Sequence, residues 1–388
     1  MLELIACVVI APPLLALAVF SVELLVGLKP LPVATASATF HRAVVLVPAH
    51  DESASIERTV GALLRATDGS RRLLVVADNC TDSTAEIARK AGAEVIERHE
   101  PSHRGKGFAL AFGRDFLSAE PPEVVVVVDA DCTISRSSLD QLIARAAEDG
   151  VPVQAINLLT PPQDAPPLVQ ISNFAMLVKN LVRARGLYRI GGGIPLFGTG
   201  MAFPWSIFAH ASLATGDTVE DLHLAVQLAR HGTPVHLVEG ANVLSPSAAV
   251  RDTLSQRRRW EHGFLQTARK KALPLVVRGI SRGSRHQTAL GLHLCVPPLA
   301  LLLLLSLLCG AAAAAIGAAA HAWLPATTLF LALAVALACI LLAWSRYGEG
   351  VLSAKALATA PLYVLRKVPL YLGFVRSRQS VWNRTPRE

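Results

Sequence analysis

Two aspartates, Asp129 and Asp131, are the residues of this sequence best suited to chemistry. They follow a run of five valines, Val124 to Val128. Side chains alternate along an extended chain, so both carboxylates point the same way from the end of a predicted buried strand. Such carboxylates repel each other unless a cation lies between them, and a hard divalent cation with oxygen ligands is the natural occupant. The alternative is an ordinary loop with two solvated aspartates.

A lysine and an acidic pair offer further chemistry. Lys106 lies between two glycines in HRGKG, which suits a loop that approaches a phosphate, although the spacing of a P-loop is missing. A solvated turn before a helix is the alternative. Glu220 and Asp221 begin a predicted helix, where the helix dipole favours acidic residues in any case. Asp221 is also a candidate general base, provided that it reaches the proton it removes.

The stretch SQRRRWEHGF, residues 255–264, combines arginine with tryptophan. On a helix, three of its side chains share one face: Gln256, Arg259 and Trp260. Arg257 can then pair with Glu261, and Arg258 points elsewhere. A guanidinium binds a diphosphate through its bidentate fork, and an indole stacks on a sugar or base. The alternative is a basic juxtamembrane helix that contacts anionic lipid.

These residues belong to a predicted α/β domain, from about residue 41 to 248, with a largely parallel sheet. The prediction rests on short apolar runs that alternate with segments whose apolar residues recur at helical spacing. The predicted buried strands are 44–47, 73–77 and 124–128, with amphipathic helices between them. Ligands bind beyond the carboxyl ends of such strands. The polar segments PAHDES, DNCTD and DADC follow the three strands, so we expect them to line one crevice.

The composition indicates membrane segments as well, because 52% of the residues are hydrophobic and only 17% are charged, against roughly a quarter in average proteins. Three stretches are long and apolar enough to span a bilayer: 2–28, 290–319 and 323–344. A cleaved signal peptide is the alternative for the first, but it has no basic start and is long for a signal. The stretch 351–375 carries Lys355, Arg366 and Lys367, and we expect it to lie at the membrane interface.

The net charge of +8 is concentrated next to the predicted spans, since residues 249–288 hold ten Lys or Arg against two acidic residues. The positive-inside rule places this flank, the basic tail and the α/β domain in the cytoplasm. The predicted organisation is a membrane helix (1–30), the α/β domain (41–248), basic interface helices (249–288), a membrane hairpin (289–345) and an interfacial helix with a tail (346–388). The six cysteines form no CxxC or Cys/His metal pattern.

Taken together, the motifs resemble the family 2 glycosyltransferases, in particular their membrane-embedded, cellulose-synthase-like branch. The resemblance covers about residues 44–263 and rests on seven elements in order: VLVPAHDES, VVADNCTD, HRGKG, VVVVDADC, FGTGMAF, VEDLHL and QRRRW. It implies a GT-A fold that binds a nucleotide diphosphate sugar, with a UDP-sugar as the first choice. Mg²⁺ or Mn²⁺ is the implied cofactor.

The resemblance also implies roles for individual residues. The implied metal ligands are Asp131 and Asp129, with Asp131 the better candidate for direct contact. Asp221 is the implied base for in-line attack with inversion. The implied donor and nucleotide site comprises Pro48, His50, Glu52, Asp78, Lys106 and Asp129. The implied diphosphate and acceptor site comprises Gln256, Arg259, Trp260, Gly200 and Glu220. Two residues depart from the family pattern, because Asp51 replaces a usual asparagine and Ala77 replaces the first acid of DDxSxD.

The expected function is therefore transfer of one sugar at a time to a lipid-linked or other membrane-proximal acceptor, by a multi-pass protein of the inner membrane whose catalytic domain faces the cytoplasm. A processive polysaccharide synthase, acting on a saccharide acceptor with an export partner that supplies the missing channel, is the alternative, although three spans are few for it. A basic membrane-anchored binding protein is a third hypothesis. A nucleic-acid binder has no need for the DxD strand end or for Glu220 and Asp221, so no nucleic-acid partner is expected.

Overall fold

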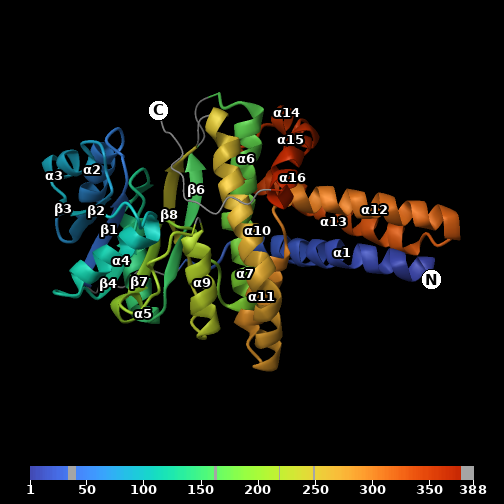
Figure 1. The fold of residues 1–388 in the computed structure, drawn as a ribbon, viewed down its shortest axis with the longest axis horizontal. Helices are drawn as coiled ribbons and strands as arrows, with labels where there is room; N and C mark the ends of the chain where they lie inside the picture. The colour runs from blue at the N-terminus through green and yellow to red at the C-terminus, as the bar shows by residue number, and fades with distance from the viewer. Residues whose placement is uncertain (34–40, 161–163, 218, 248–249, 377–388) are drawn as a thin grey trace. The chain divides into compact units, whose positions relative to one another are not determined.

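Figure 1 shows the chain as a computed structural model. It describes residues 1–33, 41–160, 164–217, 219–247 and 250–376, while the side chains of 250–256 and 375–376 lie outside the description. The chain divides into two compact units. Among the described residues, the first, here called the α/β unit, comprises 30–160 and 192–264, and the second, the helical unit, comprises 1–29, 164–191 and 265–376.

The α/β unit is built on an eight-stranded sheet with the order β3-β2-β1-β4-β7-β6-β8-β5 among the described residues. Its strands are β1 (Ala43–Ala49), β2 (Arg72–Asp78), β3 (Glu94–Arg98), β4 (Val124–Val127), β5 (Thr133–Ile134), β6 (Val153–Thr160), β7 (Met201–Pro204) and β8 (His236–Pro246). The three predicted strands are confirmed as β1, β2 and β4, which are parallel. The sheet is nevertheless mixed, because β7 runs antiparallel to both β4 and β6.

The helices of the α/β unit bury the apolar positions that the sequence pattern predicts. They are α2 (Ile56–Thr67), α3 (Thr84–Lys90), α4 (Lys106–Leu117), α5 (Arg136–Asp149), α8 (Trp205–Phe208) and α9 (Glu220–Arg230). On α2, Ile56, Val60 and Leu63 have no exposed surface and pack into the core with the valines of β1 and β4. Each such side chain stabilises the fold by roughly 1.5–3 kcal/mol. The core therefore fixes the strands whose ends carry the polar segments.

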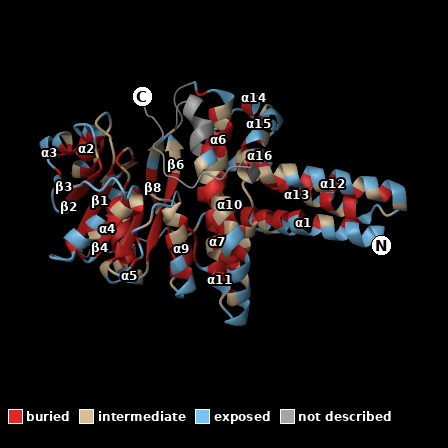
Figure 2. Cartoon of the chain, in the orientation of Figure 1, coloured by how far each residue is buried: buried red, intermediate tan, exposed pale blue. Residues whose placement is uncertain are grey.

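Three helices of the helical unit are long and apolar enough to cross a membrane: α1 (Leu2–Gly27), α12 (Leu299–Ala320) and α13 (Leu324–Tyr347). They lie side by side in Figure 1, and Figure 2 shows buried residues where they face one another and exposed residues on their outer sides. The predicted hairpin turn at His321 is confirmed, since this residue ends α12 with a φ of 55°. The predicted single span 290–319 is corrected, because Pro297 and Pro298 separate α11 (Arg285–Cys295) from α12.

Residues 161–191 group with the helical unit, whereas the sequence-based ranges placed them in the α/β domain. They form α6 (Pro167–Leu177), the π-helix η1 (Val178–Arg183) and α7 (Ala184–Gly191). The physical reason is close helix packing against α1. A Cβ atom on Gly27 would lie 1.8 Å from the Val182 carbonyl oxygen, and one on Gly186 would lie 1.9 Å from the Glu23 carbonyl oxygen. Glycine at both positions therefore lets the two backbones touch.

A buried ionic cluster explains the acidic residue in the apolar helix α1. Glu23 is 2% exposed, and its Oε2 accepts a hydrogen bond of 2.7 Å from Nε of Arg183 on η1. The other oxygen, Oε1, lies 2.8 Å from Nδ1 of His293 on α11. A charge in an apolar surrounding is tolerated only when it is paired and hydrogen-bonded. The cluster thus joins three segments of the helical unit that are far apart in the sequence.

The two remaining basic stretches are helical. α10 (Val250–Ser281) is one helix of 32 residues, which confirms the helix expected over residues 251–271. The stretch 351–375, predicted to lie at the interface, forms α14 (Ala354–Leu357), α15 (Ala360–Arg366) and α16 (Val368–Arg376). These helices have four, seven and nine residues, so each is shorter than the roughly 20 residues of a membrane crossing.

Candidate active site

The site forms where polar residues follow the carboxyl ends of β1, β2 and β4. The three strands are parallel and neighbouring, with Leu46 paired to both Leu74 and Val127. Their ends therefore meet at one edge of the sheet, as the sequence predicts. Asp78 ends β2, and Asp129 follows β4 by two residues.

Lys106 connects the DxD segment with the loop that precedes β7. It begins α4, and its ammonium group donates one hydrogen bond to Oδ1 of Asp129 and another, of 2.6 Å, to the Gly198 carbonyl oxygen. Burial lowers the pKa of Lys106, but the nearby carboxylates of Asp129, Glu220 and Asp221 more than offset this and raise the pKa above its usual value. Lys106 is therefore a fixed positive charge in the site.

The second aspartate of the DxD segment belongs to a group that suits a metal ion. Ligand atoms of Asp129, Asp131 and Cys132 all lie within 4.8 Å of one another. Burial, followed by repulsion from the two aspartates, raises the pKa of the Cys132 thiol well above its usual value. A sulfur ligand also suits soft metals, whereas Mg²⁺ and Mn²⁺ prefer carboxylate oxygen. Two carboxylates remain. A site for Mg²⁺ or Mn²⁺ commonly consists of one or two carboxylates that are completed by substrate phosphates, so these residues fit such an ion.

Asp221 and Lys106 both lie next to Gly198, in the loop that precedes β7. Asp221 is the second residue of α9, and its Oδ1 accepts a hydrogen bond of 2.8 Å from the Leu222 amide. Gly198 has a φ of +86°, and a Cβ atom there would lie 3.3 Å from Oδ2 of Asp221 and 3.8 Å from Nζ of Lys106. The absence of a side chain at Gly198 keeps the surroundings of both charges open. The candidate base, the lysine and the DxD segment are thus brought together.

Glu220, next to Asp221, has an unusual protonation equilibrium. Burial, together with repulsion from Asp221 and despite attraction by Lys106, raises the pKa of Glu220 from 4.5 to about 7. A raised carboxyl pKa stabilises the fold below the unfolded-state pKa, and this contribution is lost as the pH rises through the folded-state value. The stability of the protein should therefore fall between about pH 4.5 and pH 7 because of this one group.

Replacing Glu220 by glutamine should remove this pH dependence. We expect Glu220→Gln to match the wild type in acid and to unfold at a temperature about 6–12 °C higher at alkaline pH. The rise of the Glu220 pKa from 4.5 to about 7 corresponds to about 3 kcal/mol, and 1 kcal/mol shifts the unfolding temperature by about 2–4 °C in a domain of this size. Thermal unfolding of both proteins over this pH range tests the expectation. Parallel curves for the two proteins would show that Glu220 does not titrate in this range.

The segments after β1 and β2 form the candidate nucleotide site. Nδ1 of His50 lies 2.6 Å from the Asp78 carbonyl oxygen, which joins the two segments. Pro48 is part of β1, and the Glu52 amide donates a hydrogen bond of 2.7 Å to Oγ1 of Thr84. The carboxylate of Asp78 is buried and pairs with Nη1 of Arg98 at 2.6 Å.

Arg98 was not among the sequence-predicted site residues. It ends β3, donates a second hydrogen bond to the His103 carbonyl oxygen at 2.8 Å, and its guanidinium lies 5.4 Å from the ring centre of Phe108. The residues around Arg98, VIERHEP, contain no motif that indicates a functional site. A lone arginine at a strand end is common on protein surfaces. The structure shows that Arg98 holds Asp78 in place.

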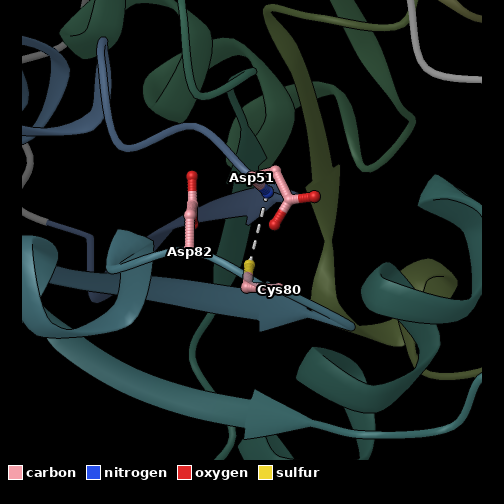
Figure 3. A group of neighbouring side chains, drawn as sticks. All are labelled: Asp51, Cys80 and Asp82. Carbon is pink, nitrogen blue, oxygen red and sulfur yellow. Dashed lines mark hydrogen bonds between the residues drawn. The ribbon is translucent and has the colours of Figure 1, made fainter.

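A second acidic group lies at the same strand ends, as Figure 3 shows: Asp51, Cys80 and Asp82. The Asp51 amide contacts the Cys80 sulfur at 3.5 Å, and burial raises the pKa of that thiol to about 11. Burial raises the pKa of Asp82, but hydrogen bonds from Thr84 and Ser53 outweigh this and lower it to about 2. Asp51 likewise accepts a hydrogen bond of 2.6 Å from the Thr81 amide. These carboxylates already bind the loops at the strand ends through hydrogen bonds, so Asp129 and Asp131 fit a metal ion better.

The Q-x-x-R-W element lies on α10, as predicted. Arg257, expected to pair with Glu261, is buried and its guanidinium lies 4.9 Å from the ring centre of Trp260. Arg258 is exposed and Arg259 is half-buried, which agrees with the predicted separation of the three arginines. The side chain of Gln256 lies outside the described residues. Gly200 lies on the loop before β7, where its amide donates a hydrogen bond of 2.9 Å to the Val127 carbonyl oxygen.

Comparisons with known proteins agree with this geometry. Residues 41–263, more than half of the chain, match the family described as "Glycosyltransferase like family 2". An uncharacterised glycosyltransferase of Mycobacterium tuberculosis is 35% identical over 88 residues, which are 23% of this chain and 38% of that protein. A dolichyl-phosphate hexose transferase of Haloferax volcanii is 35% identical over 105 residues, which are 27% of this chain and 43% of that protein. The chain thus spans less than half the length of these curated relatives.

A solved structure has the same fold. The mannosyltransferase PcManGT from Pyrobaculum calidifontis, in complex with GDP-Man and Mn²⁺, superposes with a TM-score of 0.58 at 19% identity, covering 98% of this chain and 100% of that chain. The predicted GT-A fold with three helices able to span a membrane is therefore confirmed. The family match also confirms the predicted resemblance to the family 2 glycosyltransferases, while the cellulose-synthase-like branch stays a prediction. The chain belongs to the glycosyltransferase-like family 2.

Proposed function

We propose that this protein is an inverting, metal-dependent glycosyltransferase that moves a sugar from a nucleotide diphosphate sugar to a lipid-linked or other membrane-proximal hydroxyl group. The observation that carries the proposal is the meeting of Lys106, Asp129 and Asp221 around the side-chain-free Gly198. A fixed cation, a DxD segment and a candidate base at one strand edge are what transfer from a diphosphate requires.

In the proposed reaction, Asp221 removes the proton of the acceptor hydroxyl. The acceptor oxygen attacks the anomeric carbon from the face opposite the diphosphate, and the bond from that carbon to the diphosphate oxygen breaks. Negative charge then accumulates on the leaving diphosphate. Lys106 counters this charge, and we assign the same role to Arg259, with Gln256 and Trp260 beside the acceptor. Asp131 and Asp129 would hold Mg²⁺ or Mn²⁺, which when bound supplies further positive charge to the diphosphate.

The nucleotide site is proposed at the ends of β1 and β2, with Pro48, His50, Glu52 and Asp78 around the base and ribose. A UDP-sugar remains the first choice, because the sequence motifs resemble enzymes that use it, whereas the solved relative holds GDP-Man. The name of the Haloferax relative supports a lipid-linked acceptor.

The proposed organisation places α1, α12 and α13 in the inner membrane and the α/β unit in the cytoplasm. The support is the ten basic residues of 249–288, which favour the cytoplasmic side. The ranges 1–30 and 346–388 are retained as proposed membrane and tail segments, and the proposed membrane hairpin is shortened from 289–345 to α12 and α13. Transfer of single sugars is preferred to processive synthesis, since the described residues contain three candidate spans and a translocation channel usually needs more.

One experiment tests the function. Membranes that contain the protein are incubated with a panel of labelled nucleotide sugars, with Mn²⁺ or Mg²⁺ or with chelator. We expect release of nucleoside diphosphate with one donor class, only with metal, and labelled product that partitions into organic solvent. Undiminished release in chelator would contradict the metal assignment. Product in the void volume of a size-exclusion column would show a polymer, and no release from any donor would contradict the proposed activity.

A further inference from the structure

Gln154 is a buried polar residue that the proposed reaction does not use. It lies near the start of β6, paired with Met201 of β7 and Leu237 of β8, and its side chain has no exposed surface. A buried amide destabilises a fold by about 1–3 kcal/mol unless its hydrogen bonds are made. The partners of this amide therefore show what it does.

The side chain of Gln154 binds the backbone of one loop, residues 197–200. Its Oε1 accepts a hydrogen bond of 2.8 Å from the Phe197 amide. Its Nε2 donates to the carbonyl oxygens of Thr199, at 2.8 Å, and Gly200, at 3.2 Å, and also to that of the neighbouring Ala155. Carbonyl groups on one side and an amide on the other fix the orientation of the Gln154 side chain. A single side chain thus holds both ends of this four-residue loop.

The same loop contacts three residues of the candidate active site. The Gly198 carbonyl oxygen accepts from Lys106 at 2.6 Å, and the Thr199 hydroxyl accepts from the Asp129 amide at 3.1 Å. The Cα of Gly198 faces Oδ2 of Asp221, as the 3.3 Å distance from a Cβ atom built there shows. A shift of the loop would therefore move the partners of Lys106 and Asp129 together.

We infer that Gln154 is a positioning residue, which holds the 197–200 loop so that the Gly198 carbonyl fixes Lys106 and the open face of Gly198 stays against Asp221. The inference rests on the proposed function for its effect on sugar transfer, but its structural part does not. Misplacement of a reacting group by about 1 Å can lower a rate about 100-fold. The Gln154 side chain has no exposed surface and is inaccessible to substrate, so its effect should appear in kcat.

The test replaces Gln154 by methionine, which has a similar length but makes none of these hydrogen bonds. The full-length protein in detergent is compared with the wild type by hydrogen–deuterium exchange. We expect the peptide that covers residues 194–204 to exchange about tenfold faster, because the Phe197 amide loses its acceptor. Gln141→Met is the matched control, since Gln141 also donates to a backbone carbonyl, that of Gly240, at 3.3 Å, but makes no contact with this loop.

Sugar transfer gives the second measurement. We expect Gln154→Met to lower kcat about 100-fold with little change in KM. In a Lys106→Ala background, Gln154→Met should lower kcat further by less than about threefold. The effects of two residues that act through one contact are not additive. A merely structural role would lower the melting temperature and leave the two effects additive.

Several results would overturn the inference: unchanged exchange at 194–204, an equal loss in Gln141→Met, or additive effects with Lys106→Ala. If Gln154→Met does not fold, Gln154→Asn keeps the amide but shortens its reach, and the same exchange result is expected. If the wild type transfers no sugar from any donor, the proposed function fails, while the exchange measurement still decides whether Gln154 holds the loop.

Discussion

Asp221→Asn should retain donor binding and lose sugar transfer by about 100-fold or more, because general-base catalysis contributes at least that factor. Asparagine has nearly the shape of aspartate and can keep the contact with the Leu222 amide, which the Oδ1 atom of Asp221 makes at 2.8 Å. It cannot accept the proton of an acceptor hydroxyl. Steady-state transfer and calorimetric binding of the nucleotide sugar separate these two effects.

Asp217→Asn is the matched control for this experiment. Asp217 precedes the same helix, α9, is exposed, and contacts His223 rather than Lys106 or Gly198. Its loss should change transfer by less than about threefold, as expected for a surface pair worth 0–1 kcal/mol. Full activity of Asp221→Asn would remove this residue from the mechanism. A loss of donor binding equal to the loss of transfer would show that Asp221 acts on the donor instead.

The strand ends that carry the chemistry were predictable from the sequence for a physical reason. Buried parallel strands are continuous apolar runs, and the valines before Asp129 leave no other assignment. Once β1, β2 and β4 are placed, their carboxyl ends must meet, so Asp78 and Asp129 come to one edge. Lys106 was found by its flanking glycines. The contacts of Lys106 with Asp129 and Gly198, however, depend on loops, and loops lack the periodic apolar pattern that reveals helices and strands in a sequence.

The parts that sequence reasoning missed depend on tertiary packing. Gln154 looks like an ordinary strand residue, and most partners of its amide group come from the 197–200 loop that precedes β7. β7 has four residues, too few to show a strand period. Residues 161–191 carry no long apolar run, so their place in the helical unit is decided by the backbone contacts of Gly27 and Gly186 with the facing helices. The break before α12 was visible as Pro297 and Pro298 in the predicted span.

Asp131→Asn should lower the metal-stimulated rate of transfer on the order of 100-fold or more at a fixed Mn²⁺ concentration, since a bound cation contributes several kcal/mol to the stabilisation of a leaving diphosphate. The two aspartates are not equivalent. Asp129 already compensates the charge of Lys106 through a direct hydrogen bond. Oδ1 of Asp131 instead accepts a hydrogen bond of 3.4 Å from the Cys132 thiol.

The two aspartates should therefore give different kinetic signatures. Asp131→Asn raises the Mn²⁺ concentration needed for half-maximal rate, whereas Asp129→Asn also raises KM for the nucleotide sugar, because it removes the partner of Lys106. Cys132→Ser is the control, since Mn²⁺ prefers carboxylate oxygen to sulfur and this replacement should leave the Mn²⁺ dependence unchanged. Direct Mn²⁺ binding, followed by electron paramagnetic resonance with the nucleotide present, checks the same order. Wild-type Mn²⁺ binding by Asp131→Asn would mean that the metal is held elsewhere, and the charge on the diphosphate would then fall to Lys106 and Arg259.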